Sequence, residues 1–160
     1  HELLWCTLLV GALIEYDGYR AWRRLYAPTL VLAGIAGVAL PMLHPVPAWE
    51  GIEGWYLGAA NTMAGLATGV ALGWLLSRWE PAARRNGVWL GLACIGLVLG
   101  WQAAVGLALL ASIWQITAAV VGRRIVQVRS LPTSLVLVGA TFAWLVFWSI
   151  LAQWATLGYK

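Results

Sequence analysis

Long apolar runs alternate along this chain with short polar stretches that are rich in arginine, proline or glycine. A helix that crosses a bilayer needs roughly 20 apolar residues, and several of the runs approach or reach that length. The pattern therefore predicts an all-α polytopic membrane protein, with six transmembrane helices in one domain. The expected helices cover about residues 3–15, 25–43, 55–77, 87–100, 103–121 and 133–157.

The boundary between the fourth and fifth helices has to be found inside an uncharged stretch. No charged residue occurs from Asn86 to Gly122, and one straight helix of that length would measure about 55 Å. A hydrocarbon core is only about 30 Å thick, so we expect a break. The best place for it is near Gly100-Trp101-Gln102.

Prolines mark the starts of two other helices. Pro28 lies in the first predicted turn of the second helix, where a missing backbone N–H costs nothing. Pro132 precedes the sixth helix. Between the second and third helices, the turn-rich stretch 44–53 carries Glu50 and Glu53 and is interpreted as an acidic loop.

Composition supports the membrane class. The chain is 62% hydrophobic and 10% charged, with twelve tryptophans and a mean hydropathy of +0.80, and a soluble domain with these values would precipitate. The net charge of +4 could suggest a nucleic acid as partner. However, the arginines lie in short loops between apolar runs, where basic residues orient membrane helices, so nucleic acid is excluded and the lipid bilayer is the expected partner.

The distribution of charge also predicts the orientation. With six alternating helices, the loops after the first, third and fifth lie on one side and hold nine of the ten basic residues. The positive-inside rule makes this side cytoplasmic and places both ends of the chain outside. The nine are Arg20, Arg23, Arg24, Arg78, Arg84, Arg85, Arg123, Arg124 and Arg129, and the other side holds Glu2, Glu50, Glu53 and Lys160.

Several kinds of chemistry find no signature in the sequence. Cys6 and Cys94 lie far apart inside apolar runs, which is typical of small buried residues and not of zinc sites or disulfides. A haem would need an axial histidine within the bilayer, and His44 is a poor candidate. Motifs for a serine nucleophile, a phosphate loop or a dinucleotide are absent. We expect no metal and no cofactor, and most tryptophans are interpreted as packing or lipid-facing residues, with a stacked-tryptophan cofactor site as the alternative.

The first residues of the chain do not look like the start of a complete first helix. The chain opens with His1 and its first apolar run is short for a span, so we expect it to begin inside a longer gene product or after processing.

In the fourth helix, Gly91, Gly96 and Gly100 form a face of small residues. Such faces let membrane helices approach closely, which predicts a central position for this helix.

Glu15 and Asp17 are the first candidates for a functional site, because carboxylates at a membrane edge are costly unless they are paired or hydrated. Residues two apart on a helix point in different directions, so these two cannot share a proton by themselves. An aspartyl-type site would need a second carboxylate from another helix. The alternative is a structural role, in which both acids pair with the nearby Arg20, Arg23 or Arg24.

Glu80 is the other acidic residue expected on the arginine side. It could supply a second carboxylate opposite Asp17. A salt bridge within its own loop is the competing interpretation. The arginines available for that bridge are Arg78, Arg84 and Arg85.

The segment Leu13-Ile14-Glu15-Tyr16-Asp17, followed by Pro28, resembles the first active-site segment of the type IV prepilin peptidases. These are bacterial membrane aspartyl peptidases that process pilins at the cytoplasmic face, and their segment typically contains Ile-Asp-x-Asp before a later proline. The resemblance implies that Glu15 replaces the first catalytic aspartate and that Asp17 matches the second acid of the motif. Trp22 stands where the family has another proline.

A second segment, from Leu92 to Gln102, is similar to the family's stretch that ends in Leu-Gly-Trp-Gln. In the family this stretch follows a Gly-x-Gly-Asp motif that supplies the other catalytic aspartate. Counting back from Trp101 places Gly87 and Val88 at the last two positions of that motif. The resemblance therefore implies a prepilin-peptidase-like bundle in which the second catalytic position is vacant.

Three functional hypotheses follow from these features. The first is a prepilin-peptidase-like protein of the bacterial inner membrane that lacks peptidase activity and binds or scaffolds other membrane subunits. The second is a residually active peptidase that uses Asp17 with Glu80. The third is an accessory subunit of a larger respiratory or photosynthetic complex, which the many tryptophans and few charges would suit.

Overall fold

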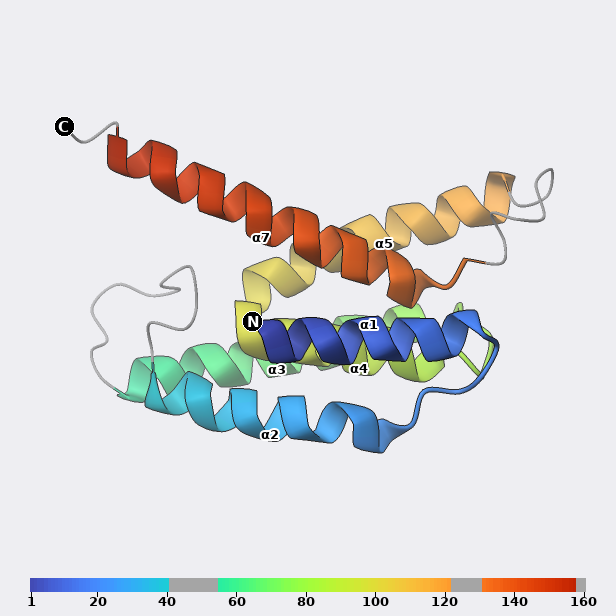
Figure 1. Ribbon diagram of the computed structural model, residues 1–160, viewed down its shortest axis with the longest axis horizontal. Helices are drawn as coiled ribbons and strands as arrows, with labels where there is room; N and C mark the ends of the chain where they lie inside the picture. Colours follow the sequence, from blue (N-terminus) through green and yellow to red (C-terminus); the bar gives the residue numbers. More distant parts are fainter. Residues whose placement is uncertain (41–54, 122–130, 158–160) are drawn as a thin grey trace.

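The computed structural model describes the backbone of residues 1–40, 55–121 and 131–157, with side chains up to residue 147 (Figure 1). Helices and no strands occur in this part of the chain, which confirms the predicted all-α class and the six helices. They are α1 (Glu2–Tyr16), α2 (Arg23–Ala39), α3 (Trp55–Ser77), α4 (Arg85–Leu99), α5 (Trp101–Val121) and α7 (Thr133–Leu157). Several predicted residues lie outside the described ranges, namely His44, Glu50, Glu53, Arg123, Arg124, Arg129 and Lys160.

The helix α4 occupies the centre of the bundle. It contacts α1, α2, α3, α5 and α7, and its residues from Asn86 to Leu99 are buried apart from the half-buried Trp89. Figure 1 shows α1 lying over α4, with α3 passing behind this pair, α2 below it and α5 and α7 crossing above it. The ends of α1, α3 and α5 and the starts of α2, α4 and α7 therefore share one end of the molecule.

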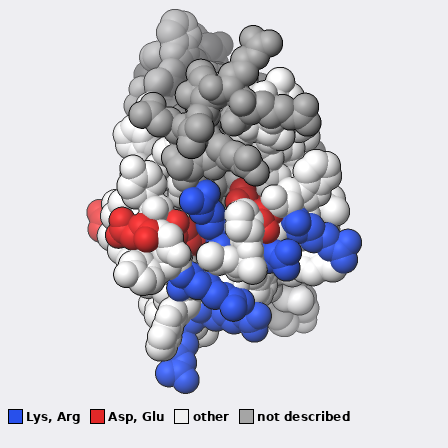
Figure 2. Space-filling view, turned by 90° about the vertical axis from the view of Figure 1, so that its right-hand side faces the viewer, with Lys and Arg blue, Asp and Glu red and all other residues white. Residues whose placement is uncertain are grey.

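All arginines in the described ranges lie at that shared end, because they follow α1 or α3 or open α2 and α4. Figure 2 views this end and shows the basic side chains gathered on it, with acidic side chains among them. Glu2 lies at the opposite end, in the first turn of α1. The described arginines and Glu2 thus lie at opposite ends of the molecule.

Two helices in the described ranges are long and apolar enough to cross a membrane, α3 with 23 residues and α5 with 21. The helices α1, α2 and α4 contain 15, 17 and 15 residues. At about 1.5 Å per residue, 15 residues span about 22 Å, which is less than a full hydrocarbon core. The structure therefore supports a membrane location through two helices and leaves six complete spans as a proposal.

Glycines bring α3 and α4 into backbone contact. Gly65 and Gly96 face each other so closely that a Cβ added to either would collide with the carbonyl oxygen of the other. Gly69 and Gly73, one and two turns further along α3, lie against Leu92 and Trp89 of α4 in the same way. Such small-residue seams let membrane helices approach at short range. Of the glycine face predicted on α4, Gly96 and Gly100 lie in this seam, whereas Gly91 lies against Leu8 of α1. The α3 side of the seam was not predicted.

The predicted break between the fourth and fifth helices is confirmed at Gly100. This residue has φ 90° and ψ 170°, a conformation that residues with a Cβ rarely adopt. Its N–H still bonds to the Gly96 carbonyl at 2.9 Å, and α5 begins at the next residue. One glycine is therefore enough to end α4 and start α5 in a new direction.

The prediction for Pro28 needs a correction. The helix α2 begins at Arg23, two residues earlier than predicted, so Pro28 lies inside its second turn and not in the first. At this position the ring removes the N–H that would bond to the Arg24 carbonyl. The apolar run starts only at Leu25, which is why hydrophobicity alone placed the helix start too late.

Candidate functional site at the start of α4

Glu15 lies in the last turn of α1 and is fully buried, with 0% of its surface exposed. Its Oε1 accepts a hydrogen bond of 2.7 Å from the backbone N–H of Gly87. Gly87 is the third residue of α4, and the first N–H groups of a helix have no partner within it. A carboxylate at this place also meets the positive end of the helix dipole. Glu15 thus caps α4 from a neighbouring helix.

Gly87 has to be glycine for this contact to form. A Cβ at this position would lie 2.6 Å from Oε1 of Glu15, 2.5 Å from its Cδ, and closer still to Oε2. Contacts of that length do not occur between real Cβ atoms and their neighbours. The carboxylate of Glu15 therefore fills the volume that a side chain at position 87 would need.

The second oxygen of Glu15 has a different environment. Ser134, near the start of α7, interacts with the Glu15 side chain. Even so, Oε2 of Glu15 and the Ser134 hydroxyl are both buried, and neither has a hydrogen-bond partner among the described residues. Ser134 was not among the candidates from the sequence, because a lone serine in an apolar helix carries no signal of its own.

Asn86 ties the loop between α1 and α2 to the same site. Its buried side chain donates from Nδ2 to the Ala21 carbonyl at 2.8 Å, and its Oδ1 accepts from Trp89 Nε1 at 3.4 Å. Arg23 lies over the ring of Trp89, 5.9 Å from the centroid. The first turn of α4 thus holds the end of α1 through Gly87 and the loop before α2 through Asn86.

The expected pairing of Glu15 and Asp17 with Arg20, Arg23 or Arg24 is not formed in the described part of the chain. Glu15 points inward to Gly87, whereas the chain turns at Gly18, which has φ 84°, before the arginines follow. Asp17 is exposed at the C-terminal cap of α1. The two acids therefore face different environments and do not act as a pair.

Glu80 belongs to another cluster, at the turn between α3 and α4. Its Oε1 accepts hydrogen bonds from the Thr133 hydroxyl and, at 3.2 Å, from Gln115 Nε2. The predicted salt bridge with a loop arginine is not formed among the described residues. Arg85 instead donates from Nε to the Glu80 backbone carbonyl at 3.3 Å. Polar side chains from α5 and α7 satisfy this acid, and neither of them carries a signal that would identify it from the sequence.

The predicted vacant position is apolar and closed. Val88 is fully buried in the hydrophobic core and brings no polar atom to the carboxylate of Glu15. Gly91, one turn further along α4, lies against Leu8 of α1, so that a Cβ there would be 3.3 Å from Leu8 Cδ2. Within the described ranges, no three His, Cys, Asp or Glu side chains gather as ligands for a metal ion.

We compared the chain with protein families, curated proteins and solved structures. No protein-family model, no curated protein and no solved structure matches the chain. The functional interpretation therefore depends on the geometry of the residues themselves.

Proposed function

We propose that this chain is a prepilin-peptidase-like protein of the bacterial inner membrane that does not cleave peptides and that binds or scaffolds other membrane proteins. The supporting observation is the contact between Glu15 and Gly87. The resemblance assigns these residues to the first catalytic acid and to the motif that would supply the second. They are neighbours in the fold, but the acid is bound to a backbone amide.

Aspartyl chemistry requires two carboxylates that share a proton and activate a water molecule between them. Glu15 has no exposed surface, and the residue beside Gly87 is the buried Val88. Asp17 is exposed and Glu80 is held by Thr133 and Gln115. This arrangement favours an inactive site over the residually active alternative, since neither of those two acids is poised against the other.

A scaffold or binding role is supported by the outer helices. The surface of α5 exposes a row of large apolar side chains, which are Leu109, Leu110, Ile113, Ile116 and Val120. Lipid or another membrane helix would cover such a row in the cell. The accessory-subunit hypothesis draws on the same row.

The proposed topology has six spans, with the arginine-rich loops in the cytoplasm and both ends of the chain outside. The shared end of the described helices carries the arginines, as the positive-inside rule requires of a cytoplasmic face. The short helices α1, α2 and α4 would then span a locally thinned bilayer or lie partly covered by neighbouring helices.

A cleavage assay tests the loss of activity. The purified protein is incubated with a prepilin-type substrate, beside an active prepilin peptidase as the positive control, and no cleavage is expected from this chain. Efficient cleavage that disappears in Glu15→Gln, which keeps the shape of the side chain, would overturn the proposal.

The binding role is tested separately by mild solubilisation and mass spectrometry of the chains that co-purify. A defined membrane partner in stoichiometric amount is expected. Pigment or haem absorbance in the same fraction would favour the accessory subunit of a respiratory or photosynthetic complex. A monodisperse protein without any partner would contradict both binding hypotheses.

A further inference from the structure

A second polar feature lies on the arginine end, apart from the Glu15 contact. It is a pocket of about 500 Å³ between the start of α2, the end of α3 and the first turns of α4. Four arginines line it, together with two tryptophans. We call it the arginine pocket, and these residues are Arg20, Arg23, Arg78, Arg85, Trp74 and Trp89.

The four arginines come from three separate places in the sequence. Arg20 and Arg23 belong to the α1–α2 connection and the start of α2, Arg78 follows the end of α3, and Arg85 is the first residue of α4. Because α3 runs antiparallel to both α2 and α4, its end meets their starts, and these places come together at one opening. From the sequence, these arginines were expected to mark the orientation and to pair with nearby acids, and their convergence could not be predicted because it depends on the fold.

No carboxylate lines the arginine pocket, and no ion pair neutralises these four arginines within the described ranges. Arg85 makes one hydrogen bond, to the backbone carbonyl of Glu80, and Arg78 lies over the Trp74 ring at 3.9 Å from its centroid. The guanidinium groups thus keep most of their donors available. Four like charges around one pocket repel each other, and an anion between them would remove that cost.

The remaining polar groups of the pocket are already satisfied inside the protein. Asn86 is engaged with Ala21 and Trp89, and the Ser77 hydroxyl donates to the Trp74 carbonyl at 2.8 Å. The arginines are therefore the groups left to bind a ligand. Arginine forks match the oxygen geometry of phosphate, and they do so better than any other side chain.

The geometry points to a phosphate-binding site: we propose that the arginine pocket holds the phosphate group of an anionic phospholipid headgroup or of a free phosphate compound. Val70, Trp74 and Trp89 add an apolar wall beside the arginines. Tryptophans at the level of the headgroups are typical of membrane proteins, and basic pockets between helices on the cytoplasmic side bind anionic lipids. A phospholipid therefore fits the pocket best, because its phosphate can bind the arginines while its apolar part contacts Val70, Trp74 and Trp89.

The test uses the purified full chain in neutral detergent, with phosphatidylglycerol, phosphatidylcholine and inorganic phosphate as separate probes. Native mass spectrometry measures the affinity for each. Phosphatidylglycerol should bind more tightly than phosphatidylcholine. The variant Arg20→Gln/Arg78→Gln should bind it about 25-fold more weakly, at about fivefold for each arginine. Both side chains are exposed, so the fold should be kept, and circular dichroism checks this.

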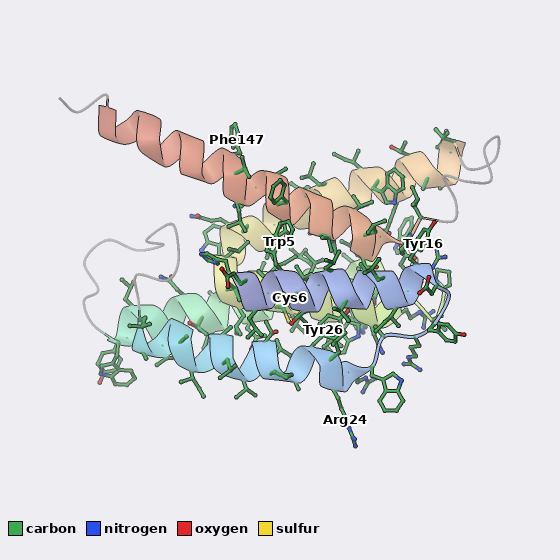
Figure 3. The ribbon with its side chains drawn as sticks, viewed as in Figure 1. Trp5, Cys6, Tyr16, Arg24, Tyr26 and Phe147 are labelled. Carbon is green, nitrogen blue, oxygen red and sulfur yellow. The ribbon has the colours of Figure 1, made fainter. Side chains whose placement is uncertain are left out.

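A matched control removes the same charge outside the pocket. Arg24 points away from the bundle (Figure 3), and Arg84 lines a different cleft beside Glu80. The variant Arg24→Gln/Arg84→Gln should therefore bind phosphatidylglycerol nearly as well as the wild type. Equal weakening in both double variants would show a diffuse charge effect and overturn the proposal.

The phosphate arm identifies the source. Binding of inorganic phosphate that is lost in Arg20→Gln/Arg78→Gln, without preference for phosphatidylglycerol, supports the site with a free phosphate compound as its ligand. Preference for phosphatidylglycerol that millimolar phosphate does not displace supports the lipid. If neither probe depends on Arg20 and Arg78, the arginine pocket is not a phosphate site.

Discussion

The Glu15 side chain at the end of α1 accepts a hydrogen bond from the Gly87 backbone N–H at the start of α4, with 2.7 Å between Oε1 and the amide nitrogen. The two residues are 72 positions apart in the sequence. The contact joins the peripheral helix α1 to the central helix of the bundle. It also places a buried carboxylate where only a glycine backbone leaves room for it.

Gly87→Ala should destabilise the fold by about 1–3 kcal/mol, because its Cβ would collide with the Glu15 carboxylate and overpack the site. The midpoint of thermal unfolding in detergent measures the effect. Gly34→Ala is the control, since no atom lies within 4 Å of a Cβ at that position in α2. In the double variant Glu15→Ala/Gly87→Ala the penalty of the Cβ should largely disappear. Additive effects of the two changes would contradict the collision.

Glu15→Gln should be tolerated far better than Glu15→Ala. The glutamine carbonyl can accept from Gly87, its amide can donate to the buried Ser134 hydroxyl, and no buried charge remains. Its effect on the free energy of unfolding should stay within about 1 kcal/mol, whereas alanine leaves the Gly87 N–H without a partner at a cost of about 1–3 kcal/mol. Chemical denaturation in detergent compares the two variants. Equal losses would show that the negative charge itself is required.

Gly96→Ala should weaken the packing of α3 on α4 more severely. Its Cβ would run into the Gly65 carbonyl and lie 3.3 Å from Gly69 Cα, and these backbone atoms cannot rotate away. A loss of about 3 kcal/mol, at the upper end for overpacking, is expected in the same unfolding measurement. Gly139→Ala in α7, with no atom within 4 Å of the new Cβ, should be close to neutral. A neutral Gly96→Ala would mean that the two helices are further apart than described.

The hydroxyl pair of Thr7 and Thr29, 2.6 Å apart between α1 and α2, predicts an asymmetric pair of variants. Thr7 donates its proton to the Leu3 carbonyl at 2.8 Å, so Thr29 is the donor within the pair. Thr7→Val leaves the buried Thr29 hydroxyl without this acceptor and should cost about 1–3 kcal/mol. Thr29→Val leaves Thr7 bonded to Leu3 and should cost clearly less. The opposite order in unfolding free energies would reverse the assigned donor.

The proposed orientation predicts which residues a membrane-impermeant thiol reagent can reach. Tyr19 is 72% exposed beside the arginines, and Trp55 is 57% exposed at the start of α3, at the other end. In a Cys6→Ala background, with the fully buried Cys94 kept, Trp55→Cys should react in cells whose inner membrane is intact. Tyr19→Cys should react only after that membrane is permeabilised. The reverse result would invert the topology.

The helices could be predicted from the sequence because hydrophobic run length sets them almost alone. The third and sixth helices have the predicted ends, and the break at Gly100 followed from comparing helix length with bilayer thickness. The start of α2 was harder to predict from hydrophobicity, because the helix already includes the polar residues Arg23 and Arg24.

The contacts of the candidate site depend on how helices slide and rotate against each other, and the sequence does not encode this locally. Proximity in the sequence favoured arginines as partners of Glu15, but the last turn of α1 directs this side chain inward to α4. The same holds for Glu80, whose partners Gln115 and Thr133 come from distant helices. Residues such as these become recognisable only when the packing is known.

Gly100 has a consequence for the second half of the molecule. Its φ of 90° turns one uncharged stretch into two antiparallel helices, so that α5 returns to the end of the bundle from which α4 began. If residue 100 continued the helix, α5 would prolong α4, and α7 would start from the end of the bundle that lacks arginines. The end of the bundle at which α7 begins therefore depends on the backbone torsion of a single residue.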